Sequence, residues 1–208
     1  MKDDFLIANW NKLTEDFTAV RFDFFQELIK LYGSKGRYYH NLNHIKTLLK
    51  LSGQYRSLLG SPQAVDFAIW YHDAIYQVLK QNNEEKSAEL AKEHLLKMGV
   101  CGRVISDCFK LILGTKSHKL SDDLLTFDAK FLMDIDLLIL AESREVYLQY
   151  VRNIRREYGV FPDLIFNRAR KEVLRRFLTS ERIFKTVIFY DLNEKKAREN
   201  LAYELNSY

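Results

Sequence analysis

The chain reads SPQAVDFAIWYHDAIY over residues 61–76, and this stretch decides the fold class. From Val65 onward its apolar residues recur at three- and four-residue intervals, which is the spacing of one helical face. Ser61-Pro62 is typical of a helix start, because the serine hydroxyl can cap the helix and proline fits the first turn. The stretch therefore predicts an apolar helix that carries His72 and Asp73.

The same spacing recurs along most of the chain, and strict alternation of apolar and polar residues is absent. The 8 Gly and 2 Pro among 208 residues argue against a β-sandwich or barrel, which needs many turns. We therefore predict an all-α helical bundle. Helices are expected at about 5–17, 24–32, 42–60, 62–75, 83–98, 103–113, 121–136, 144–158, 162–178 and 193–205.

No linker, internal repeat or low-complexity segment interrupts the sequence, so we expect a single domain over residues 1–208. Its core, at about 37–140, would hold any site, and the C-terminal helices of 144–208 would pack on that core. A chain of this size needs no metal for stability. We therefore interpret any metal site as chemical rather than structural.

The net charge of +4 and the pI of about 8.9 are too mild a bias to indicate a nucleic-acid binder. The spacing of Cys101 and Cys108 fits neither a redox pair nor a zinc site, so we expect two buried thiols in a reducing compartment. No apolar run approaches the ~18 residues of a membrane span, and the acids at the start do not fit a signal peptide. We expect a cytoplasmic protein with no nucleic-acid or membrane partner.

His72 and Asp73 stand side by side in an apolar stretch, where burial without partners would cost several kcal/mol. A hydrogen-bonded His-Asp pair is one explanation, and a metal cation is another. His44 at the edge of an apolar helix face and Asp136 in an apolar run supply two more ligands. This mixed nitrogen and oxygen set suits Mn, Fe, Ni, Co or Zn, with Mg as a further candidate, rather than Ca.

Five short elements follow one another in order along the chain. They are RYYHNLNH at 37–44, YHDAIY at 71–76, NEEKSA at 83–88, TKSH at 115–118 and DIDL at 134–137. This series resembles the HD superfamily of metal-dependent phosphohydrolases, and most closely a bacterial group of predicted HD-superfamily phosphohydrolases of about this length. The resemblance covers nearly the whole chain and implies an HD-domain-like bundle.

The resemblance implies a divalent ion that activates a water for in-line attack on phosphorus. The implied metal ligands are His44, His72, Asp73 and Asp136. Asp73 would also accept a proton, and Glu84 would orient the water or act as a second base. Charge on the phosphate would be met by Arg37, His40, His118 and Arg155.

Several of these assignments have a rival. His40, one helical turn before His44, is the rival ligand, and Asp134 competes with Asp136, although we expect Asp134 to support the site or the fold instead. His118 could bind a second ion or be an exposed loop histidine. Glu84 could simply stabilise a helix N-terminus, by ~0.3–1 kcal/mol.

The expected reaction is hydrolysis of a phosphomonoester or phosphodiester of a nucleotide or another small molecule. A nucleotide is one candidate because rings at positions 38, 39, 70, 71 and 76 crowd the site and one or two could stack on a base. A homodimer is one candidate state. The alternative is a catalytically silent nucleotide-binding or regulatory protein that retains the metal site. We expect His94 at the surface and the basic residues between 152 and 176 on a solvated face.

Overall fold

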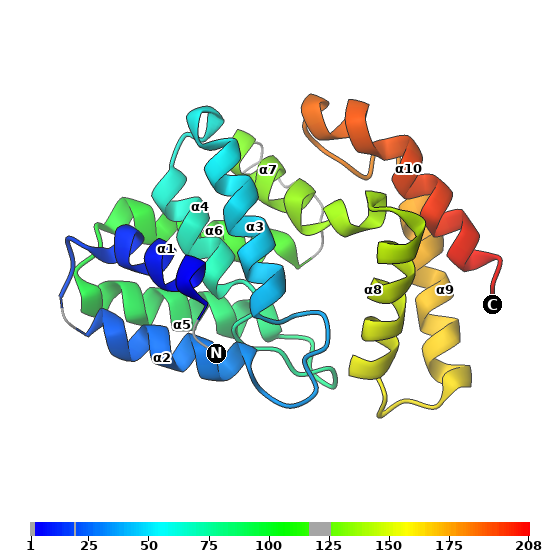
Figure 1. Cartoon of the computed structure of the whole chain (residues 1–208), viewed down its shortest axis with the longest axis horizontal. Coiled ribbons are helices and arrows are strands. Elements are labelled where there is room, and N and C mark those ends of the chain that lie inside the picture. The colour runs from blue at the N-terminus through cyan, green and yellow to red at the C-terminus, as the bar shows by residue number, and fades with distance from the viewer. Residues whose placement is uncertain (1–2, 19, 117–125) are drawn as a thin grey trace. The chain divides into compact units, whose positions relative to one another are not determined.

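The computed structural model describes residues 3–18, 20–116 and 126–208 (Figure 1). No strand occurs among these residues, which confirms the all-α prediction for the part of the chain that the structure describes. The elements in order are α1 (Asp4–Thr14), α2 (Arg21–Tyr32), α3 (Leu42–Gln54), η1 (Arg56–Leu58), α4 (Pro62–Tyr71), α5 (Asn83–Met98), α6 (Gly102–Thr115), α7 (Phe127–Asp136), η3 (Leu138–Ala141), α8 (Arg144–Glu157), α9 (Asp163–Thr179) and α10 (Val187–Leu205).

The chain divides into two compact units, Met1–Leu132 and Met133–Tyr208, and the division falls inside α7. The expectation of one domain, with helices of 144–208 packed on a core at 37–140, stays a prediction.

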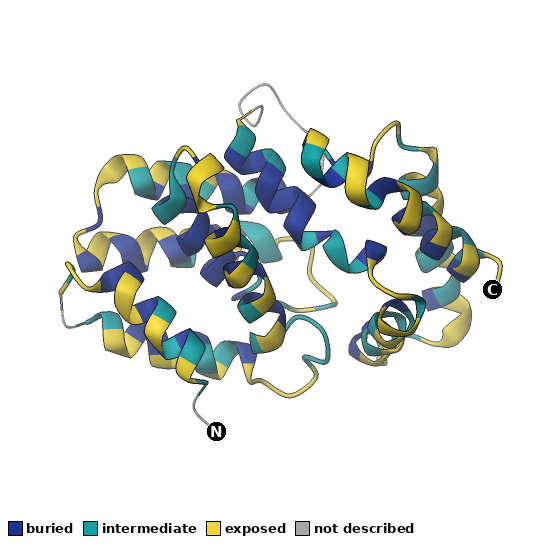
Figure 2. Cartoon of the chain, turned by 45° about the horizontal axis from the view of Figure 1, so that its top comes forward, coloured by how far each residue is buried: buried dark blue, intermediate teal, exposed yellow. Residues whose placement is uncertain are grey.

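Helix α4 is the centre of the first unit. Every residue from 64 to 71 is buried, and α4 contacts α3, α5 and α6. Trp70 packs edge-on against Trp10, with ring centroids 5.3 Å apart. A helix that is apolar on all sides has to be enclosed, which explains why its neighbours surround it. The buried residues of these helices are dark blue in Figure 2.

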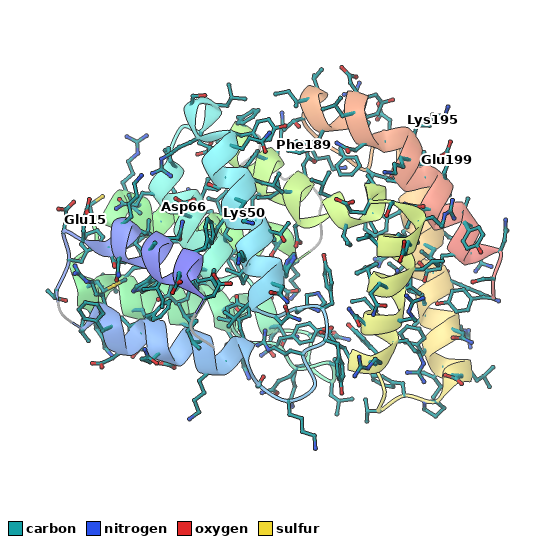
Figure 3. All side chains as sticks on the ribbon, viewed as in Figure 1. Glu15, Lys50, Asp66, Phe189, Lys195 and Glu199 are labelled. Atoms are coloured by element: carbon teal, nitrogen blue, oxygen red, sulfur yellow. The ribbon has the colours of Figure 1, made fainter. Side chains whose placement is uncertain are left out.

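Asp66 is the one carboxylate inside this apolar helix (Figure 3). Its two oxygens accept hydrogen bonds from Ser52 Oγ (2.5 Å) and Arg56 Nη1 (2.8 Å). Ser52 belongs to α3 and Arg56 belongs to η1. Both oxygens of the buried carboxylate therefore have hydrogen-bond donors, and these bonds also join α4 to α3 and η1.

The start of α4 differs in detail from the prediction. Pro62 occupies the first turn as expected, but the Ser61 hydroxyl makes no capping hydrogen bond. The carboxylate of Asp128 in α7 replaces it, accepting from the backbone nitrogens of Gly60 (2.8 Å) and Ser61 (2.7 Å). A side chain distant in sequence therefore caps α4 and joins it to α7.

Several helix boundaries differ from the prediction, including the end of α3, which lies at Gln54 and not near residue 60. Helix α4 ends at Tyr71, so His72 is its C-cap and Asp73 lies in the following turn. Helix α10 begins at Val187, earlier than expected, because the Thr186 hydroxyl caps it by accepting from Phe189 N (3.3 Å). The helix start expected at 121 lies outside the described residues.

The second unit contains η3, α8, α9 and α10, with α10 packed against α9 and η3. Its buried ion pair joins Arg170 and Glu204 through two hydrogen bonds of 2.8 and 2.9 Å. Tyr147 Oη also donates to the Glu204 carboxylate. Arg170 is thus an exception to the solvated basic face predicted for this region.

No helix within the described ranges is long and apolar enough to cross a membrane. The two cysteines are free thiols with different surroundings. Cys108 is buried, as predicted, and burial raises the pKa of its thiol. Cys101 is exposed, so the prediction of two core thiols is wrong for this residue.

Candidate metal centre

The orientation of His72 follows from the end of α4. The last carbonyls of a helix have no partner within it, and His72 satisfies two of them. Its backbone nitrogen donates to Ala68 O (2.8 Å) and its Nδ1 bonds to Ile69 O (3.0 Å). A carbonyl oxygen can only accept, so Nδ1 carries the proton. In the neutral ring Nε2 therefore carries a lone pair, the form that binds a metal.

The two remaining carbonyls at this helix end also have donors. Tyr32 Oη, from α2, donates to Trp70 O (3.0 Å), and Ala74 N donates to Tyr71 O (2.9 Å). All four terminal carbonyls of α4 are satisfied, which gives His72 a rigid support.

Three of the predicted ligands form one cluster. His44, His72 and Asp136 each offer one ligand atom, and these atoms lie within 4.8 Å of one another. His44 comes from the first turn of α3, and Asp136 is the last residue of α7. Both imidazoles are buried and Asp136 is half-buried.

The Asp73 carboxylate lies against both imidazoles. Its Oδ2 is 3.1 Å from His72 Nε2 and 3.9 Å from His44 Nε2. Three ligand atoms, from α3, the end of α4 and the end of α7, thus lie close together, and the Asp73 carboxylate lies beside the two imidazoles. Two imidazole nitrogens and two carboxylates fit a divalent transition-metal ion.

No family model matches the chain, and neither the curated proteins nor the solved structures include a match. The chemistry available to the site follows from its own donors.

Arg37 and His40 lie beside the cluster in the connection between α2 and α3. Arg37 donates from Nη1 to Asp73 O (2.6 Å) and from Nη2 to Ala74 O (2.7 Å). The His40 ring stacks on Tyr76, with centroids 4.4 Å apart, and lies 6.1 Å from the His44 ring. Their predicted phosphate contacts stay predictions.

The other predicted residues are less directly tied to the cluster. Glu84 is half-buried in the first turn of α5, and its catalytic role stays a prediction. His118 lies outside the described residues. Arg155, in the second unit, donates to Asp163 Oδ1 (2.6 Å from Nη2) and to Tyr158 O (3.0 Å from Nη1), which hold the turn after α8.

Two residues to which sequence reasoning gave no role at the site support the segment after α4. Ser87 Oγ accepts from Ile75 N (3.0 Å), and Asn83 exchanges two hydrogen bonds with the Gln77 backbone (3.0 and 3.1 Å). Both belong to the NEEKSA element, so that element was the available signal. Their hydrogen bonds join α5 to the segment that follows Asp73.

Asp134, the rival of Asp136, supports the fold. It is fully buried and accepts from Lys185 N (2.5 Å), Thr186 N (2.8 Å) and Thr186 Oγ1 (2.7 Å). Burial raises the pKa of this carboxyl, against the lowering effect of those hydrogen bonds. Its oxygens hold the start of α10.

His94 is buried, so the prediction of a surface histidine is wrong. Its ring stacks on Phe24 with centroids 3.8 Å apart, and its Nδ1 lies 3.1 Å from Tyr71 Oη. Burial lowers the pKa of this imidazole. Tyr71 and Trp70 are fully buried as well, which leaves them unable to stack on a substrate base.

Proposed function

We propose that this chain is a metal-dependent phosphohydrolase of the HD type. The observation that carries the proposal is the convergence of His44, His72 and Asp136, whose ligand atoms lie within 4.8 Å, with Asp73 against both imidazoles. We propose Mn, Fe, Ni, Co or Zn as the bound ion, with Mg as a further candidate. Such an ion would lower the pKa of a water molecule and polarise a phosphoryl oxygen.

The protein's own residues would divide the remaining work. His72 presents Nε2 in a fixed direction because Nδ1 is held by Ile69 O. Asp73, with a side chain 19% exposed, is within reach of solvent and would accept the proton of the attacking water at a carboxylate oxygen. Because both imidazoles are buried, bulk water would not reach the proposed ion from the side of His44 and His72.

The proposed substrate is a small phosphate ester, and a nucleotide is one candidate. The half-buried ring of Tyr39 lies 5.0 Å from the His44 ring, and Tyr76 lies 4.4 Å from His40. These rings support recognition of a planar group beside the phosphate. The free thiols of Cys101 and Cys108 support a cytoplasmic location.

The proposal is tested by metal analysis and turnover together. The wild-type protein is reconstituted with each candidate cation, its metal content is measured, and phosphomonoesters, phosphodiesters and nucleotides are screened. Asp73→Asn is expected to lower turnover at least about 100-fold and to weaken metal binding. Asp66→Asn is the matched control, since Asp66 pairs only with Ser52 and Arg56 in the contacts described, and it should keep its metal.

Wild-type protein that retains none of the cations would contradict the proposal. Saturable nucleotide binding by the metal-loaded protein without any turnover would instead favour the catalytically silent alternative.

A further inference from the structure

The three hydrogen bonds described for Arg37 all go to backbone carbonyls. Its two terminal nitrogens donate to backbone carbonyls, at 2.6 Å to Asp73 O and 2.7 Å to Ala74 O. These carbonyls belong to the turn that presents the Asp73 side chain. The guanidinium thus acts on the backbone that carries a proposed metal ligand.

The same guanidinium reaches a second segment. Nη1 also donates to His40 O (3.1 Å), in the connection that leads into α3. The next residue, Asn41, caps α3 by accepting from Asn43 N (2.9 Å), and His44 lies in the first turn of that helix. One planar group therefore joins the turn of Asp73 to the start of the helix that carries His44.

Aromatic rings hold the guanidinium in place. Its central carbon lies 5.0 Å from the Tyr32 ring centroid and 5.4 Å from that of Tyr76. Contacts of this kind attract the cation to the rings and restrict the orientation of the guanidinium plane. The positive charge also lies beyond the C-terminal end of α4, where the helix dipole is negative.

We propose that Arg37 is a positioning residue that sets the separation of the Asp73 and His44 ligand atoms. This inference rests on the proposed metal site. A lysine at this position would keep the charge, but its single ammonium group cannot span three carbonyls as the planar guanidinium does. Arg37→Lys is therefore the informative substitution.

Arg21 provides a matched control in the same unit. Its Nη1 donates to Thr14 O (2.5 Å), Glu15 O (2.7 Å) and Phe17 O (3.2 Å), between α1 and α2. Its guanidinium also lies over an aromatic ring, that of Phe22, at 4.9 Å. Arg21→Lys removes the same kind of carbonyl clamp from a connection that carries no proposed ligand.

The experiment compares wild-type protein, Arg37→Lys and Arg21→Lys. Co²⁺ is titrated into each metal-free protein while its visible absorption is recorded, because this spectrum reports the coordination geometry. Arg37→Lys is expected to bind Co²⁺ about 10- to 100-fold more weakly, with an altered spectrum, as is typical when the support of a ligand is lost. Arg21→Lys should keep both the wild-type affinity and spectrum.

Hydrogen exchange of residues 72–76 in the metal-free proteins gives a second readout. Exchange there should rise in Arg37→Lys and stay at the wild-type level in Arg21→Lys. If Arg37→Lys binds Co²⁺ as the wild type does, the inference is overturned while the metal site stands. If the wild type binds no cation, the proposed function falls, and equal exchange at 72–76 in the two variants would then overturn the positioning of this turn as well.

Discussion

The Nδ1 atom of His72 donates to the carbonyl oxygen of Ile69, at 3.0 Å, across the last turn of α4. One hydrogen bond thus satisfies a helix end and fixes which imidazole nitrogen faces Asp73. The hydrogen bond that satisfies the end of α4 therefore also orients the proposed metal ligand.

Replacing His72 by Gln should therefore have two effects. Metal affinity should fall at least about 100-fold, and the free energy of unfolding should drop by about 1–3 kcal/mol because Ile69 O loses its donor. Urea unfolding and metal titration measure the two effects. His94→Gln, at a buried histidine that contacts Phe24, Tyr71 and Glu27, should cost stability without changing metal affinity. Equal metal binding by the wild type and His72→Gln would contradict this assignment.

The cap that Asp128 provides to α4 can be measured on its own. Asp128→Ala removes the acceptor for the backbone nitrogens of Gly60 and Ser61, and should destabilise the protein by about 1–2 kcal/mol. Asp128→Asn keeps one acceptor oxygen and should lose less. Thermal unfolding gives the order of the three proteins, and an alanine variant as stable as the wild type would show that the cap contributes nothing.

His94 should make stability depend on pH. Because burial holds its folded-state pKa below the unfolded value of 6.5, the folded protein binds fewer protons. The contribution is present above pH 6.5 and is lost as pH falls through the lowered pKa. The stability of the wild type relative to His94→Gln should therefore decrease as pH falls from 7.5 towards 5. Glu27 and Glu93 oppose this lowering of the pKa, and Lys97 favours it. A difference in stability between the two proteins that stays the same from pH 7.5 to pH 5 would contradict the prediction.

The buried pair of Arg170 and Glu204 provides a test of the second unit. Arg170→Met leaves the Glu204 charge buried beside Tyr147 and should cost about 3–5 kcal/mol. The double variant Arg170→Met with Glu204→Met should recover most of that loss. Arg103→Met, at an exposed ion pair with Asp107, should change stability by less than about 1 kcal/mol. Urea unfolding of the single variants and the double variant measures this recovery. A double variant as unstable as Arg170→Met would contradict the interpretation.

Local patterns predicted the helices well where local signals set their ends. Helix α5 runs from Asn83 to Met98 as expected, because acids follow its start and Gly99 adopts the left-handed conformation (φ 82°) that ends it. Helix α4 was predicted too long because apolar spacing continues to Ile75. One of its terminal carbonyls, Trp70 O, is satisfied by Tyr32, which lies far away in sequence and leaves no local signal.

At the candidate site, too, local sequence patterns predicted some features and contacts distant in sequence determined others. The ligand set could be proposed from charged residues in apolar runs, whereas the contacts of Arg37 required the fold. The surface prediction for His94 is wrong because the charged residues beside it in sequence lie on other faces of the helix. Ala91 and Leu95, also buried, are three residues before it and one after it, so the helical period carried the signal for its burial.

The burial of helix α4 on every side restricts which residues can occupy it. A residue within it cannot change size without disturbing α3, α5 or α6, so the position of His72 is bound to the stability of the whole first unit. The half-buried rings of Tyr39 and Tyr76 lie outside that helix and carry no such restriction. Sequence variation at these rings would therefore change what the proposed site recognises without changing the proposed metal ligands.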